Sequence, residues 1–120
     1  MAKPQTTAPP TVTDVKPYAG QEIPKGGYTY IPVSCTALDS TGSAVWQVNF
    51  YIDPEGETVS APSNRNKAAA GLSTFWAQEG GKFSGTLSLQ NVQPGTHVFR
   101  VDAFDINKKL TRVQHEIVIT

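Results

Sequence analysis

The sequence is poor in cysteine, which limits the ways in which the fold can be stabilised. Cys35 is the only cysteine among 120 residues, so no disulfide can form within the chain and a disulfide scaffold is excluded. A chain of this length can still bury roughly two thirds of its unfolded surface, which is enough for one hydrophobic core. We interpret Cys35 as a small buried hydrophobic residue, because nothing near it in the sequence would lower the pKa of its thiol.

The chain also lacks an excess of charge and long apolar runs. Ten acidic and ten basic side chains give a formal net charge of zero, whereas nucleic-acid binding needs clustered positive charge. No stretch approaches the roughly 18 apolar residues that span a bilayer, and residues 1–10 have no apolar signal-peptide core. We therefore expect no nucleic-acid partner and no membrane insertion. The low net charge gives little protection against self-association, which leaves room for a homodimer.

Helical patterns are missing as well. No segment longer than ten residues repeats its apolar side chains with a period of 3.6, and 10 Gly with 9 Pro suit short strands joined by turns. Apolar and polar residues alternate instead, most clearly over 45–52. There, one face carries Trp46, Val48, Phe50 and Ile52, and the other carries Gln47, Asn49 and Tyr51. Strands are predicted at 11–16, 33–39, 45–52, 72–78, 83–89, 97–104 and 110–119, with a kinked edge segment over 20–30.

These segments predict one domain of a definite class. Seven or eight short strands without helical connections exclude parallel βαβ winding and favour an antiparallel two-sheet β-sandwich. We place this all-β, immunoglobulin-like domain at residues 11–120. Residues 1–10 contain three prolines and are predicted to form a disordered lead-in.

The second half of the chain also carries a recognisable run of residues. The segment Gly80–Leu87 reads GGKFSGTL, and Pro94–His97 and the alternating Phe99, Val101 and Ala103 follow before Asp105. This run resembles bacterial immunoglobulin-like repeats and is similar to the fibronectin type III pattern. Residues 11–16 and 22–27 look like the repeats of pseudomonad surface proteins. The resemblance implies an extracellular or cell-surface setting.

Two further expectations concern details of that resemblance. In antibody-like domains a core cysteine packs on a tryptophan. Cys35 and Trp46 have about the spacing of such a pair, but the partner strand near Val101 offers no second cysteine. Residues 57–77 are longer than the middle of such repeats. We expect this insertion to cover a strand edge or to carry a binding surface.

Catalytic and metal-binding constellations are not recognisable. His97 and His115 lie on separate predicted strands, and we interpret both as structural, since a zinc site needs three or four converging ligands. Asp53, Glu55 and Glu57 share one turn with Pro and Gly between them, which favours a solvated turn over calcium binding. No serine lies in a Gly-x-Ser-x-Gly context. We therefore predict no enzyme, no cofactor and no metal.

Surplus aromatic residues are the feature that best indicates a function. Tyr51 and Phe104 fall on the polar face of their strands, and one of Phe75 and Trp76 must point away from the other. Outward aromatic rings hold protein partners, neighbouring domains or sugars, or else they cover strand edges. The candidate partner-binding residues are Tyr51, Phe75, Trp76 and Phe104, with Arg65 and Lys67 of the 61–77 region.

The favoured hypothesis is a non-enzymatic interaction module of a bacterial surface, secreted or phage assembly. On this hypothesis the chain binds a protein partner through the exposed aromatics and the 61–77 region. Two alternatives remain: a free-standing secreted effector acting as a homodimer, and a carbohydrate-binding module that uses Trp76.

Overall fold

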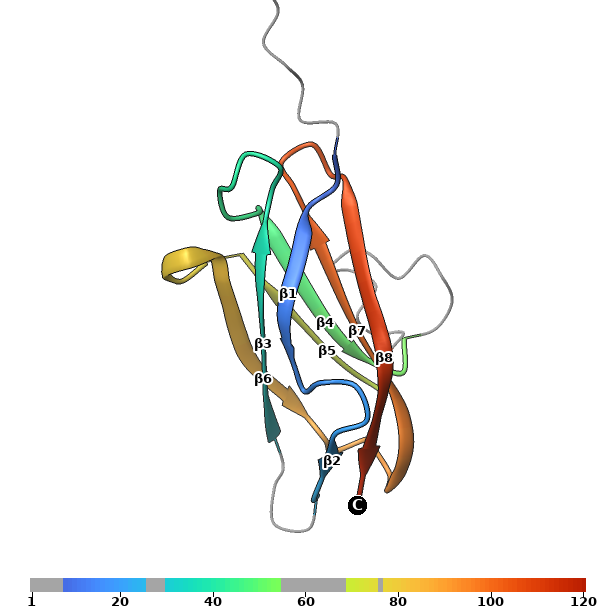
Figure 1. Cartoon of the computed structure of the whole chain (residues 1–120). Helices are drawn as coiled ribbons and strands as arrows, with labels where there is room; N and C mark the ends of the chain where they lie inside the picture. Colours follow the sequence, from blue (N-terminus) through green and yellow to red (C-terminus); the bar gives the residue numbers. More distant parts are fainter. Residues whose placement is uncertain (1–7, 26–29, 55–68, 76) are drawn as a thin grey trace, which may run out of the picture.

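Two β-sheets lie face to face in this chain (Figure 1). The computed structural model describes residues 8–25, 30–54, 69–75 and 77–120. The strands are β1 (Thr11–Lys16), β2 (Glu22–Ile23), β3 (Tyr30–Leu38), β4 (Gln47–Ile52), β5 (Ala70–Thr74), β6 (Lys82–Ser88), β7 (Gly95–Phe104) and β8 (Leu110–Ile119). A short 3₁₀ turn, η2 (Glu79–Gly81), precedes β6.

The strand order identifies the type of sandwich. One sheet has the order β1-β3-β6 and the other β2-β8-β7-β4-β5, and each pair is antiparallel except β2 with β8. The orders β1-β3-β6 and β8-β7-β4 match the A-B-E and G-F-C arrangements of the immunoglobulin fold. The predicted all-β sandwich of seven to eight strands is therefore confirmed.

The core lies between the two sheets, and the predicted alternation fills it. On β3 the most deeply buried side chains are Val33, Cys35 and Ala37, each at most 1% exposed, and Ile31 is buried as well. The opposite sheet contributes Val48, Phe50, Ile52, Phe99, Val101, Ala103, Ile117 and Ile119. Burial raises the pKa of the Cys35 thiol to about 12. Cys35 is thus an unreactive core residue, as predicted.

Trp46 departs from the predicted alternation. We expected it in the core with Val48, but it is 48% exposed. The chain bends at this residue before β4 begins, and Val45 is the buried side chain instead. The core position that parity predicted for Trp46 is therefore wrong.

Some expectations fall on residues that are not described. Residues 1–7 of the predicted lead-in lie outside the described part, and so do 57–68 and Trp76 of the expected insertion. The strand predicted at 72–78 is observed as β5 (Ala70–Thr74), which ends earlier.

Gly85 sits where the two sheets approach at one edge. It lies on β6 opposite Val33, in the first sheet, whereas Leu72 lies on β5 in the second. A Cβ atom added at Gly85 would lie 2.3 Å from Leu72 Cδ2. The missing side chain therefore lets β5 come close to β6.

Replacing Gly85 with Ala should crowd this contact. We expect the free energy of unfolding to fall by about 1–3 kcal/mol, because the added methyl must displace the Leu72 side chain. Urea denaturation of the wild type and G85A measures this cost. In an L72A background the same change should lower the free energy of unfolding very little, because Leu72 Cδ2 is no longer there to clash. An equal cost in both backgrounds would contradict the proposed contact.

Candidate functional site

Four apolar side chains lie together at one end of the outer face of the five-stranded sheet. Phe104 pairs with Gln47 on one side and with Leu110 on the other. Phe75 follows Thr74, whose partner is Val48, so Phe75 also lies next to Gln47. The Trp46 and Phe75 rings meet edge to face, with centroids 5.6 Å apart. We call Trp46, Phe75, Phe104 and Leu110 the apolar row.

The apolar row is open to solvent. Trp46 is 48% exposed, Phe75 41% and Leu110 36%, while Phe104 is partly buried. Ile106, in the turn between β7 and β8, is 81% exposed. Large apolar side chains that cluster at a surface mark contact sites more often than scattered ones do.

Beside the apolar row, the same sheet face carries a buried polar layer. Gln47 Nε2 donates to Asn49 Oδ1 at 2.9 Å, and Asn49 Nδ2 donates to the Tyr51 hydroxyl oxygen at 3.0 Å. All three side chains are at most 2% exposed. Burial raises the pKa of the Tyr51 hydroxyl. These groups can stay buried because they satisfy one another.

An ion pair completes this layer on β7 and β8. Arg112 donates from Nε to Asp102 Oδ1 at 2.8 Å and from Nη2 to Oδ2 at 3.2 Å. Arg100 Nε donates to Gln114 Oε1 at 2.7 Å. Burial raises the pKa of Asp102, and the hydrogen bonds and charge of Arg112 only partly offset that effect. The two-pronged pairing keeps the buried carboxylate satisfied.

The structure separates the predicted binding residues into three groups. Phe75 and Phe104 lie in the apolar row on the outer face, which parity predicted for Phe104 and for one of Phe75 and Trp76. Tyr51 lies on the same face but is fully buried in the polar layer, so its expected exposure is wrong. Trp76, Arg65 and Lys67 lie outside the described residues.

Sequence reasoning missed Trp46 as a surface residue. Its parity matched the core residues of β4, and only a break in the strand could have reversed that prediction. The adjacent Val45 was the available signal, since it offers a second apolar side chain for the same core position.

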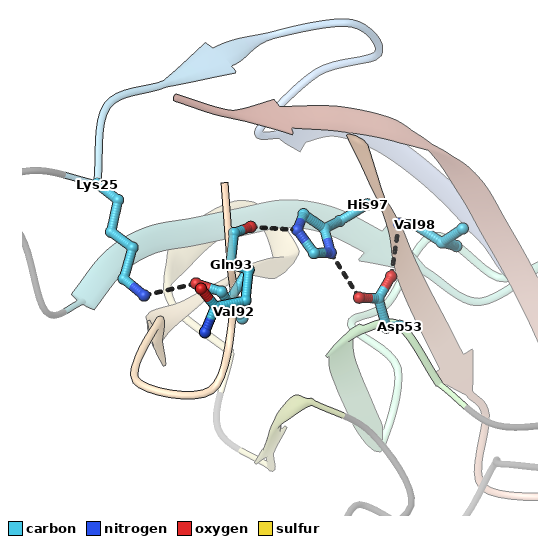
Figure 2. Close-up of polar contacts among 6 residues, drawn as sticks. All are labelled: Lys25, Asp53, Val92, Gln93, His97 and Val98. Atoms are coloured by element: carbon cyan, nitrogen blue, oxygen red, sulfur yellow. Dashed lines mark hydrogen bonds and ion pairs between the residues drawn. The ribbon is translucent and has the colours of Figure 1, made fainter. Parts of the chain in front are cut away.

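A second polar cluster lies at the opposite end of β4 (Figure 2). Asp53 Oδ2 lies 2.5 Å from His97 Nδ1, and Asp53 Oδ1 accepts the Val98 N–H at 2.9 Å. The other ring nitrogen of His97, Nε2, lies 2.5 Å from the Gln93 carbonyl oxygen. From another side, Lys25 Nζ donates to the carbonyl of Val92 at 2.5 Å.

The partners of His97 favour its charged form. A carbonyl oxygen and an ionised carboxylate can only accept, so a ring that carries two protons can donate to both partners at once. Partial burial by itself lowers the pKa of His97. The hydrogen bonds to Asp53 and Gln93 and the charge of Asp53 together outweigh that effect, so the pKa lies above its ordinary value. The His97 ring has no nitrogen free to act as a base, which supports its predicted structural role.

The other polar residues singled out in the sequence also have partners. His115 Nε2 lies 2.9 Å from the Pro17 carbonyl oxygen. Asp105 Oδ1 accepts the backbone N–H groups of Asn107 and Lys109, both at 2.8 Å, within its own turn. Asp53, in the turn expected to be solvated, is partly exposed and receives two contacts, while Glu55 and Glu57 of that turn lie outside the described residues.

The described residues contain neither a cluster of metal ligands nor a membrane-spanning helix. No three His, Cys, Asp or Glu side chains of the described ranges converge as metal ligands would. In the same ranges, no helix has the length and apolar character to cross a lipid bilayer.

The His97 contacts predict a dependence of stability on pH. Since the pKa of His97 is raised above its ordinary value of 6.5, its stabilisation is complete below the pKa of the unfolded chain. The stabilisation is lost as the pH rises through the higher pKa of the folded protein. We expect the free energy of unfolding to fall by about 0.5–1 kcal/mol across that range, since solvent screens a partly exposed pair.

Urea titrations between about pH 6 and pH 9 measure this slope. H97Q should abolish the contribution, because a glutamine amide does not titrate, whereas H115Q should retain it. A slope that survives in H97Q would show that another group is responsible.

Comparison with known proteins gives a likeness in structure only. No protein-family model matches the chain, and no curated protein matches it in sequence. An endo-beta-1,4-mannanase from Thermotoga petrophila superposes with a TM-score of 0.61 and 13% identity, over 95% of this chain. A chitin-active lytic polysaccharide monooxygenase superposes over 86% of this chain and 60% of its own, with a TM-score of 0.40 and 12% identity. This chain spans 20% of the mannanase's length, and the likeness to that segment shows a shared fold.

Proposed function

We propose that this chain is a non-enzymatic binding domain that holds a protein partner or a neighbouring domain at the apolar row. The exposed Trp46–Phe75 ring pair is the observation that carries the proposal. Aromatic side chains supply much of the binding energy at protein interfaces, because they bury a large area with few rotatable bonds. The row extends through Phe104 to Leu110, so the contact would cross four strands.

The buried strand next to the apolar row favours this function. β4 is buried along its whole length, on both faces of the sheet. Contact residues held by such strands keep their positions, which lowers the ordering cost of binding. The likeness to a segment that makes up 20% of the mannanase adds support. In that enzyme the fold is one part of a larger chain, where neighbouring domains are natural partners. The resemblance of residues 80–105 to bacterial repeats favours a surface, secreted or phage assembly.

Carbohydrate binding is the second candidate. Its specific support is that the similar mannanase is named for action on a polysaccharide, and aromatic rings can stack on sugars. The interplanar angle of 69° between Trp46 and Phe75 favours the first candidate, however. A sugar ring stacks on a flat aromatic face, and two rings set edge to face do not form one flat platform.

Photo-crosslinking from the apolar row tests the proposal. With p-benzoylphenylalanine in place of Phe75, we expect one native protein, or one neighbouring domain, to be captured reproducibly and identified by mass spectrometry. The same group in place of Tyr30 is the matched control, because Tyr30 is 58% exposed but belongs to the other sheet. Trp46→Ala should weaken binding of the captured partner at least about 10-fold, and Tyr30→Ala should leave it unchanged.

Two outcomes would contradict the protein-binding proposal. One is equal capture from positions 75 and 30, which would show non-specific contact. The other is the absence of capture together with binding of mannan oligosaccharides that Trp46→Ala abolishes, which would favour the carbohydrate candidate.

A further inference from the structure

The outer face of the three-stranded sheet differs from that of the five-stranded sheet. Lys16 on β1 pairs with Ser34 on β3, which pairs with Ser84 on β6. In the next row, Thr36 pairs with Lys82. Two lysines therefore lie on the two outer strands, with hydroxyl side chains between them.

This face is hollowed rather than flat. Lys16 and Lys82 both line a hollow of about 190 Å³, together with Asp14, Ser34 and Thr36. A second hollow of about 380 Å³ shares both lysines and continues along β6 to Thr86. A third, of about 340 Å³, lies on the other side of Lys16 and is lined by Pro17 and Tyr18, among others. We call these three adjoining hollows the lysine furrow.

The polar groups of the lysine furrow are available to a ligand. Among the described residues, neither Lys16 nor Lys82 has an ion pair or a side-chain hydrogen bond. The hydroxyls of Ser34, Ser84 and Thr86 are likewise without a hydrogen-bond partner in the described part of the chain. Lys25, by contrast, is engaged by the carbonyl of Val92. The furrow thus offers several unused donors.

The charge of the lysine furrow and the tyrosine at one end indicate which class of ligand the furrow can bind. Among the described residues, Asp14 is the only carboxylate that lines the three hollows, against two lysines, so the furrow favours an anionic group. The hydroxyls can both donate to and accept from other hydroxyls. Tyr18 is 61% exposed at one end, where its ring can stack on a sugar.

We propose that the lysine furrow binds an acidic sugar chain, with a carboxylate held by Lys16 and Lys82 and a neighbouring sugar ring against Tyr18. This chemistry uses the charge, the free hydroxyls and the aromatic ring together. An acidic peptide fits less well, because peptides that bind sheets usually add a strand along an edge. The register of β1 with β3 shifts between Thr13 and Lys16, which interrupts that edge.

The lysine furrow lies on a different sheet from the apolar row. The proposal for sugar binding at the furrow can therefore fail without affecting the proposal for protein binding at the apolar row. Lysines on outer strands also deter unwanted strand pairing. That role requires charge alone and predicts no affinity for an acidic sugar.

NMR titration of the whole chain with trigalacturonate tests the proposal. We expect the amide signals of Lys16, Ser34 and Lys82 to shift, and K16A/K82A to weaken binding at least about 10-fold, because both charge contacts are lost. Fully methyl-esterified trigalacturonate, which carries no charge, should bind as weakly as that double variant binds the acid. K108N/K109A is the matched control: it removes two lysines from the β7–β8 turn and should bind normally.

Several results would overturn the proposal. The first is the absence of shifts with trigalacturonate while the spectra show each variant folded. A second is equal loss of binding in K108N/K109A, which would indicate non-specific attraction. A third is triglutamate binding as tightly as trigalacturonate with the same sensitivity to K16A/K82A, which would assign the furrow to acidic peptides.

Discussion

The buried ion pair between Asp102 and Arg112 is the constraint on which the outer face of the five-stranded sheet depends. Asp102 is fully buried, and Arg112 holds both of its oxygens. Removing the arginine would leave an uncompensated carboxylate in the protein interior, which is strongly destabilising. The pair therefore ties β8 to β7. Since β7 also pairs with β4, the strands that carry the apolar row share one fixed register.

The two sheet faces and the end of β4 offer different surfaces. The five-stranded sheet exposes apolar rings at one end, next to polar groups that already satisfy one another. The three-stranded sheet exposes lysines and hydroxyls that are not engaged. At the far end of β4, the His97 ring joins the β6–β7 turn to Asp53 through contacts from both of its nitrogens. The exposed apolar rings, the unengaged lysines and the His97 contacts thus lie on separate parts of one small sandwich.

Much of this fold could be predicted from the sequence, because alternation directly reflects which side of a strand faces the core. The alternation predicted the core residues Val33, Cys35 and Ala37 of β3 and Phe99, Val101 and Ala103 of β7. It did not predict that Arg100 and Asp102, on the opposite face of β7, are buried as well. Parity identifies a face but does not determine exposure, and this is why Tyr51 was expected at the surface although it is buried. It also fails where a strand bends, as at Trp46. The contact of Asp53 with His97 joins residues 44 positions apart, and no local pattern predicts such a pair.

The central claim is that Trp46 is an exposed contact residue, while Tyr51, on the same sheet, belongs to a buried polar layer. Photo-CIDNP NMR tests it most directly, because only aromatic rings that a dissolved dye can reach become polarised. We expect strong signals from Trp46 and from the exposed Tyr18 and Tyr30, and none from the buried Tyr51. A polarised Tyr51 or a silent Trp46 in the folded protein would contradict it.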